Sequence, residues 1–358
     1  MTSAEPPSPP IPVPPVPPAP SAQPTDPSVG YPSLSKTPPA PTAAPVGYPP
    51  AVTPVEYGVI AQGVQRTFGS VRAVEDVQVL ARRGAVTALI GPNGSGKTTL
   101  MLMLAGLLVP DAGRIFIDGM DPVTQNYAAR SRVGWMPDVF GTWDSLTARE
   151  VLETTGATYR LPAGYAKQRA AELLTTVHLT ELADQPAHVL SRGQKQRLGL
   201  ARALVHSPSV LILDEPANGL DPRSRIELRT LVRAIAAAGT TVLISSHILT
   251  ELDEMVDDAV FISGGLTVAS ESVADARTAH RTWRMKAMTP EPLHAWLRSV
   301  NVPYVDQPDG SLVLQLGGEE AASRLLHDSV TAGVPVVSLA PSGGALEQTY
   351  LSLNEERR

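Results

Sequence analysis

The segment Gly91–Thr99, GPNGSGKTT, has residue types and a spacing that suit the binding of nucleotide phosphates. It fits the pattern G-x-x-x-x-G-K-[ST] and follows an apolar run at residues 86–90 that predicts a buried strand. Glycines let successive backbone N–H groups face one phosphate, and the N-terminus of the next helix adds partial positive charge. The predicted phosphate loop consists of Gly91, Pro92, Asn93, Gly94, Ser95, Gly96, Lys97, Thr98 and Thr99.

Acidic side chains that suit the same chemistry follow a second apolar run. Lys97 is expected to contact β- and γ-phosphates, and the Thr98 hydroxyl is expected to complete a Mg²⁺ shell. The segment VLILDEP at residues 210–216 predicts a strand that ends at Asp214, which is expected to hold Mg²⁺ through water. Because side chains alternate along a strand, Glu215 is expected to face the attacking water, as a general base or an orienting group.

The basic segment Leu190–Arg202, LSRGQKQRLGLAR, allows two interpretations. Its basic residues suit the phosphates of a nucleic acid, but the formal net charge of −6 weighs against that function. Ser191 and Gln194 have the spacing of a capping box, which predicts a helix that begins at Arg192. Gly193 lies in the first turn of this helix and leaves room for an approaching group, so the segment is also a candidate anion site.

The order of the motifs resembles that of the ABC-type ATPases. The phosphate loop is followed by LSRGQ, then VLILDEP, then GLDP at residues 219–222, and then His247 after VLISS. The resemblance covers roughly residues 56–275. It implies an α/β P-loop fold with a RecA-like parallel sheet core, an antiparallel β flap and a helical subdomain. It also implies an enzyme that binds ATP and Mg²⁺ and hydrolyses ATP.

The resemblance further implies a dimer, because two nucleotide-binding domains of this family pair head to tail. Ser191, Gly193 and Gln194 would then complete the ATP site of the partner, in a homodimer or with a second ABC ATPase. Asp221 matches the loop residue that links the two sites. The basic residues around Ser191 would be solvated helix surface, so no nucleic-acid partner is expected.

Two other residues take their roles from the same resemblance. His247 matches the histidine that hydrogen-bonds the γ-phosphate, so the expected catalytic set is Glu215, His247 and Lys97. Phe68, in RTFGSVRAV, matches the aromatic residue that stacks on adenine. The alternative for Phe68 is an ordinary buried position in the core.

Two positions depart from the family pattern. Asp138, in VGWMPDVFG, replaces a glutamine that ligates Mg²⁺ and senses the attacking water. Aspartate can do both but adds a negative charge that the metal must offset, so the expected metal ligands are Thr98, Asp138 and Asp214. Arg192 replaces the first glycine of LSGGQ.

The segments PDVFGTWDSLTAREVL, SRGQKQRLGLARAL and SSHILTELDEM resemble the branch that energises ABC-2-type exporters. That resemblance implies separate integral-membrane permease subunits and a cytoplasmic position at the inner face of the cell membrane. No apolar run in the chain approaches the roughly 20 residues that span a bilayer. The alternatives are an importer ATPase, a soluble ABC ATPase acting on ribosomes or nucleic acid, and an inactive regulator, which Glu215 disfavours.

Composition divides the chain into three predicted parts. Residues 1–55 are rich in proline and predict a disordered tail, whose PxxP spacings could also dock in an SH3-like groove. Residues 56–275 alternate strand and helix patterns, as expected for a nucleotide-binding domain with a doubly wound parallel sheet. Residues 276–358 follow a βαββαβ order and predict a small α+β domain. The chain has no cysteine, which excludes disulfides and thiolate metal ligands.

Overall fold

The computed structural model describes residues 56–139, 141, 145–246, 249–273, 280–344 and 346. Every described residue belongs to one compact unit. The predicted proline-rich tail and the predicted domain boundary near residue 275 lie outside the described residues. Among the helices of the described part, none combines the length and the apolar character needed to span a bilayer.

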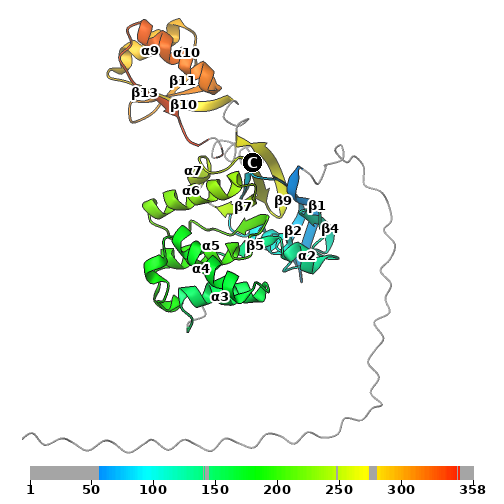
Figure 1. Ribbon diagram of the computed structural model, residues 1–358. Helices are drawn as coiled ribbons and strands as arrows, with labels where there is room; N and C mark the ends of the chain where they lie inside the picture. The colour runs from blue at the N-terminus through cyan, green and yellow to red at the C-terminus, as the bar shows by residue number, and fades with distance from the viewer. Residues whose placement is uncertain are drawn as a thin grey trace, which may run out of the picture. The chain divides into compact units, whose positions relative to one another are not determined.

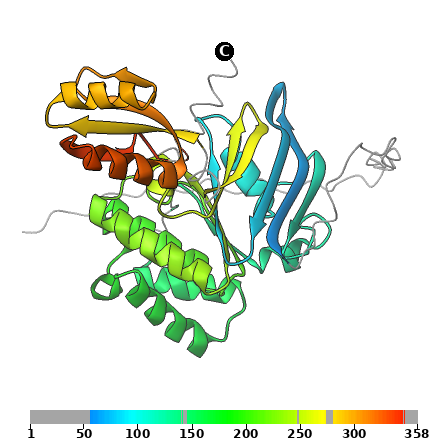
Figure 2. The same ribbon diagram turned by 90° about the horizontal axis from the view of Figure 1, so that it is seen from above.

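A nine-stranded sheet with the strand order β4-β1-β2-β9-β8-β3-β7-β6-β5 forms the centre of the described residues before 274. Six of its strands are labelled in Figure 1. Its strands are β1 (Tyr57–Phe68), β2 (Val71–Arg82), β3 (Val86–Ile90), β4 (Ala112–Ile117), β5 (Val133–Met136), β6 (Val210–Leu213), β7 (Thr241–Ser246), β8 (Asp258–Ser263) and β9 (Leu266–Ser272). Strands β8, β3, β7, β6 and β5 run parallel to one another. Strands β1, β2 and β4 pair antiparallel and lie side by side at one end of the sheet (Figure 2), which confirms the predicted flap.

Both faces of the parallel strands are buried, which explains why their sequences are apolar without alternation. Within β3, Ala88 and Ile90 belong to the core on the face of the helical region, whereas Leu89 belongs to the core beneath the flap. Strand β6 divides in the same way, with Leu211 on the first face and Ile212 on the second. The sheet is therefore held on both sides, and its strand ends are rigidly placed.

Helices cover the two faces and lead away from the strand ends. They are α1 (Lys97–Leu104), α2 (Asn126–Arg130), α3 (Ala148–Thr158), α4 (Ala163–Thr176), α5 (Arg192–Leu204), α6 (Pro222–Ala237) and α7 (Leu249–Leu252). Helices α3, α4 and α5 pack together as the predicted helical region (Figure 1). Helix α5 begins at Arg192 with both bonds of the capping box, because Ser191 Oγ accepts from Gln194 N and Ser191 N donates to Gln194 Oε1.

A four-stranded antiparallel sheet forms near the end of the described chain, in the order β11-β12-β10-β13. Its elements are β10 (His280–Ala287), α9 (Pro290–Ser299), β11 (Tyr304–Asp306), β12 (Leu312–Gly317), α10 (Gly318–Thr331) and β13 (Val336–Pro341). They have a core of their own that includes Trp283, Met285 and Leu314. The helix predicted from ALEQTYLSL lies outside the described residues apart from Leu346.

Candidate active site

The predicted phosphate loop connects the end of β3 to the start of α1, and its glycines serve two purposes. Gly94 and Gly96 have φ angles of 80° and 98°, which side chains rarely allow. At Gly91 the φ angle is ordinary, but a Cβ atom would collide with the backbone carbonyl of Ile262. A Cβ atom at Gly96 would collide with the carbonyl of Ala73. The loop is therefore shaped by backbone conformation at its tip and by close packing at its base.

Lys97 lies over this loop, as its proposed contact with phosphates requires. Its Nζ donates to the carbonyl oxygens of Gly91 at 2.8 Å and Pro92 at 3.2 Å. Burial lowers the pKa of the Lys97 ammonium, while the charges of Glu215 and Asp214 act in the opposite direction. A buried cation that is bonded to two neutral carbonyls keeps charge available for an anion.

Asp214 follows β6 and is held by two hydroxyl groups. The Ser245 hydroxyl donates to Asp214 Oδ1 at 2.6 Å, and the Thr98 hydroxyl donates to Asp214 Oδ2 at 2.9 Å. The carboxylate is buried, with 3 % of its residue surface exposed. Hydroxyl groups orient a carboxylate without neutralising it, so the negative charge at Asp214 suits a divalent cation.

Glu215 differs from the prediction in its backbone conformation. It lies beyond the last residue of β6 and has a φ angle of 48°, in the left-handed region. Its N–H donates to Ser245 Oγ at 2.9 Å, and its carbonyl accepts from Asn218 N at 3.0 Å. The expectation that strand alternation aims this side chain is wrong, because a tight turn sets its direction instead.

These groups border one cavity of about 390 Å³ at the C-terminal ends of the parallel strands. It is lined by Val71, Arg72, Ala73, Asn93, Gly94, Gly96, Lys97, Thr98, Thr99, Asp138, Asp214 and Glu215. Backbone N–H groups and Lys97 suit the phosphates of ATP, and the oxygens of Thr98 and Asp214 suit Mg²⁺. Among the described residues no three His, Asp or Glu side chains form a ready metal site, so such an ion would need substrate or water oxygens as well.

Asp138 joins the cavity from the end of β5. Its Oδ1 accepts from Asn218 Nδ2 at 3.1 Å, and its carbonyl accepts from Gln196 Nε2 at 3.4 Å. Nearby, the Asp214 N–H donates to the Met136 carbonyl at 2.9 Å, which fixes β5 beside β6. Asp138 therefore lies at the same edge of the sheet as Asp214 and Glu215, where the parallel strands end.

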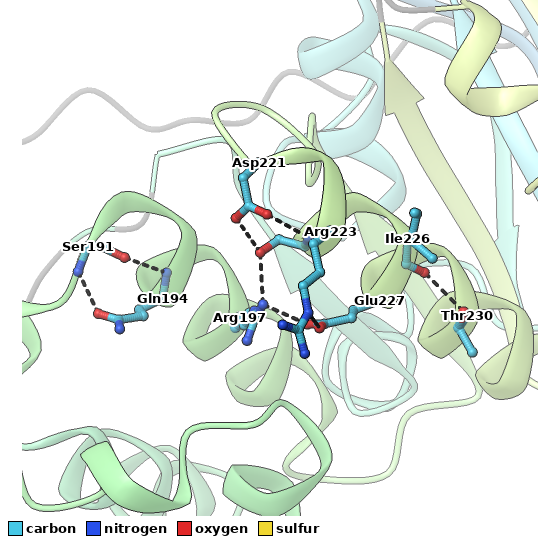
Figure 3. A network of polar contacts seen from close by, with 9 residues as sticks. Ser191, Gln194, Arg197, Asp221, Arg223, Ile226, Glu227 and Thr230 are labelled. Atoms are coloured by element: carbon cyan, nitrogen blue, oxygen red, sulfur yellow. Dashed lines mark hydrogen bonds and ion pairs between the residues drawn. The ribbon is translucent and has the colours of Figure 1, made fainter.

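The residues predicted to reach a partner lie at the starts of α5 and α6 (Figure 3). Ser191 and Gln194 form the cap of α5, and Asp221 caps α6 by accepting from Ser224 N at 3.0 Å and Ser224 Oγ at 2.6 Å. The bonds from Ser224 lower the pKa of the Asp221 carboxyl. Of these residues and Gly193, none lines the cavity around Lys97 in the same chain.

Helices α5 and α6 are joined by a polar network that the sequence did not reveal (Figure 3). Arg197 donates to Ser224 Oγ at 2.8 Å and to Glu227 Oε2 at 2.7 Å. Glu227 also accepts from Arg223 at 3.1 Å. The starts of the two helices are thereby held together.

Of the two remaining residues matched to the family, the structure describes Phe68 but not His247. Phe68 is 46 % exposed at the end of β1, and the Arg66 guanidinium lies 4.8 Å from its ring centroid. It is not an ordinary core residue, and it remains a candidate for stacking on adenine. His247 lies outside the described residues, so its role stays a prediction.

Two polar residues that hold the acids of the site were missed in the sequence. Ser245 bridges Asp214 and Glu215 through one hydroxyl, and Asn218 holds Asp138. The position of Ser245 at the end of an apolar run was the available signal, since polar residues at strand ends in open α/β sheets line ligand sites. Asn218 carried no comparable signal, because its partner is 80 residues away in the chain.

Comparisons with known proteins agree with this geometry. Residues 74–218 match the family model described as ABC transporter. The chain is 38 % identical over 217 residues to the daunorubicin resistance ATP-binding protein DrrA3 of Streptomyces coeruleorubidus, covering 61 % of this chain and 68 % of the relative. It is 34 % identical over 215 residues to the linearmycin resistance ATP-binding protein LnrL of Bacillus subtilis (strain 168), covering 60 % and 69 %.

A solved structure of an ATP-binding subunit of an ABC transporter has the same fold, with a TM-score of 0.57 and 28 % identity. The match covers 61 % of this chain and 91 % of that chain. The fold and the site define a P-loop protein that hydrolyses ATP. The chain belongs to the family of ABC transporter ATP-binding proteins.

Proposed function

We propose that this chain is the ATP-hydrolysing subunit of an ABC-2-type exporter and acts with separate integral-membrane permease subunits. The observation that carries the proposal is the convergence of Lys97, Thr98, Asp214 and Glu215 on one cavity at the ends of parallel strands. Such an arrangement suits phosphoryl transfer, in which catalysis consists of positioning and electrostatic stabilisation.

Each group of the cavity has a proposed part in hydrolysis. The N–H groups of the phosphate loop and Lys97 bind the phosphates, and Thr98, Asp138 and Asp214 hold Mg²⁺. The metal ion, when bound, neutralises charge that develops on the phosphates. Glu215 accepts a proton from the attacking water or orients it, from a backbone position fixed by Ser245.

Completion of the site requires a partner in this proposal. Ser191, Gly193 and Gln194 lie apart from the cavity of their own chain, yet α5 offers a capped, glycine-bearing N-terminus that suits an anion. We propose that they contact the γ-phosphate held by a second copy or by a second ABC ATPase, and that Asp221 links the two sites. His247 would contact the γ-phosphate from the same chain.

Export is favoured by the names of three relatives, which are a daunorubicin resistance ATP-binding protein, a linearmycin resistance ATP-binding protein and a Nod factor export ATP-binding protein. Import is the nearest alternative, with the same chemistry at the ATP site. We propose a position at the inner face of the cell membrane, held there by the permease. We also propose that the helical region around residues 138–149 passes motion to the permease. Residues 140 and 142–144 of this region lie outside the described residues.

The test is capture of tagged Glu215→Gln protein from gently solubilised membranes with ATP, followed by identification of what co-purifies. A stoichiometric integral-membrane protein with several transmembrane helices is expected, and it should be lost when ADP replaces ATP or when Lys97→Ala is added. Recovery of ribosomes or DNA in place of a membrane protein would contradict the exporter function and favour the alternative that acts on ribosomes or nucleic acid.

A further inference from the structure

The two residues that depart from the family pattern contact the same short loop. This loop, Pro216–Asp221, leads from Glu215 to the start of α6. From one side, Asp138 Oδ1 accepts a hydrogen bond of 3.1 Å from Asn218. From the other, the Arg192 side chain lies over Gly219, where a Cβ atom would come within 2.7 Å of Arg192 Cδ and 3.0 Å of Arg192 Cζ.

The loop is held in a compact conformation by backbone hydrogen bonds of its own. Asn218 N donates to the Glu215 carbonyl at 3.0 Å, and Leu220 N donates to the Ala217 carbonyl at 3.1 Å. Leu220 is buried, and its Cδ2 lies 3.3 Å from where a Cβ atom at Gly193 would be. The loop therefore contacts Glu215 on one side and the first turn of α5 on the other.

Arginine suits the contact with Gly219 because its guanidinium is flat and tolerates close packing against a backbone. The contact also requires glycine at 219, whose φ angle is 75° and whose missing Cβ leaves the space that Arg192 fills. A glycine at position 192, as in the usual family pattern, would leave this space empty. The Arg192 side chain is exposed, so burial in a core does not explain why position 192 is arginine.

We infer that Arg192 and Asn218 are positioning residues that hold the Pro216–Asp221 loop between Asp138 and the start of α5. Asp138 accepts the bond from Asn218 through Oδ1, and in the proposed function its carboxylate holds Mg²⁺, so the loop is tied to the proposed metal side of the cavity. The Arg192 side chain packs on Gly219 and so connects the loop to the start of α5, where Ser191 and Gln194 form the cap. The inference rests on the proposed roles of Glu215 and Asp138.

The first test compares Arg192→Ala and Asn218→Ala with Lys195→Ala, a control that removes a charge from the same helix start. Each test variant should lower kcat by about five- to thirtyfold, the size expected for one lost contact, while KM changes little. In the nucleotide-free protein, amide hydrogen exchange in peptides covering residues 215–221 should rise in both test variants and not in the control. Wild-type kcat and unchanged exchange in both would overturn the inference.

The second test introduces a clash at Gly219. Gly219→Ala puts a Cβ atom where the Arg192 side chain lies, so this exposed side chain should move off the loop, and alanine is also strained at a φ angle of 75°. Gly219→Ala should therefore lower kcat at least as much as Arg192→Ala, and adding Arg192→Ala to it should lower kcat no further. A further loss in the double variant would show that Arg192 acts elsewhere than on this loop. Arg192→Lys, which keeps the charge and loses the flat packing, should resemble Arg192→Ala.

Failure of the proposed function is distinguished by Glu215→Gln. If that variant hydrolyses ATP at the wild-type rate, the catalytic assignment on which the inference rests is wrong. If it is inactive while the Arg192 and Asn218 variants behave as wild type, only the positioning role fails.

Discussion

The nine-stranded sheet and the four-stranded sheet near the end of the described chain both pack on apolar cores, but their strands run in different directions and place different polar groups at the strand ends. Each has its own apolar core. In the large sheet β3, β6 and β7 run parallel, so Lys97, Asp214 and Ser245 meet at one edge.

In the small sheet every pairing is antiparallel, so successive strands end at opposite edges. Its polar groups form small surface pairs such as His294 with Asp306 at 2.8 Å and Arg298 with Tyr304 at 3.1 Å. Strand direction, more than residue content, therefore concentrates charged groups in one region of the molecule.

The largest effect is expected at the shared edge of the large sheet. Glu215→Gln should lower kcat by about 10²- to 10⁴-fold, since it removes the proposed base, while ATP binding persists and a dimer accumulates. Phosphate release, binding of labelled ATP and size-exclusion chromatography with ATP measure the three properties. Glu181→Gln, at an exposed position, is the control. A Glu215→Gln variant with wild-type turnover would contradict the assignment.

The small sheet should respond in stability and not in turnover. Met285 is fully buried in its core, so Met285→Ala should destabilise these strands by about 2–5 kcal/mol. Hydrogen exchange across β10 should rise, whereas phosphate release should stay near the wild-type rate. Leu326→Ala, at a residue that is 37 % exposed, should have a smaller effect on exchange. Loss of turnover in Met285→Ala comparable to that of Glu215→Gln would mean that the small sheet belongs to the catalytic machinery.

Ser245 tests whether one hydroxyl at the shared edge matters more than an equivalent hydroxyl elsewhere. Ser245→Ala removes the bonds to Asp214 and Glu215 and should lower kcat by roughly ten- to a hundredfold. The matched control is Ser209→Ala, which removes a bond of 2.8 Å to Asp118 before β6 begins. Equal effects on kcat would show that position relative to the strand ends does not decide the outcome.

The smallest effect concerns acid sensitivity of the large-sheet region. Burial lowers the pKa of His206 to about 4, and its ring stacks on Tyr159 with centroids 3.7 Å apart. Because the folded state binds this proton less readily than the unfolded state, the contribution to stability is present above pH 6.5 and is lost as the pH falls toward 4.

Between pH 7 and pH 5 the free energy of unfolding should fall more in the wild type than in His206→Gln. The expected difference is about 1 kcal/mol, which is less than the full pKa shift would give because the ring is partly exposed to solvent. Urea unfolding at both pH values measures the difference, and His327→Gln at an exposed position is the control. An identical pH dependence in wild type and His206→Gln would remove His206 as its source.

Features encoded in adjacent residues could be predicted from the sequence. The strand Val86–Ile90 agrees with its prediction, and α5 begins at Arg192 because Ser191 and Gln194 cap it locally. The predicted βαββαβ order includes a strand where β11 lies, but its three residues are too few to carry a pattern that would give its bounds. The segment Val71–Ala73 at the start of β2 was missed as part of the cavity, since only tertiary packing brings it beside the phosphate loop.

The turn at Glu215 could not be predicted for a different reason. An apolar run before two acids indicates a strand, but it does not indicate where the strand stops and a left-handed residue begins. Two contacts fix this turn. Asn218 N donates to the Glu215 carbonyl within the turn, and Ser245, which accepts from Glu215 N, comes from the end of another strand and meets Glu215 only in the folded chain.

The left-handed backbone at Glu215 sets stability against turnover. A residue with a Cβ atom in this region costs about 1–3 kcal/mol, which glycine would largely relieve. A descendant of this chain that no longer needed to split ATP would gain by replacing Glu215 with glycine. Stability therefore favours glycine at position 215, whereas ATP hydrolysis favours glutamate. The glutamate found there indicates that selection for hydrolysis outweighed the cost in stability.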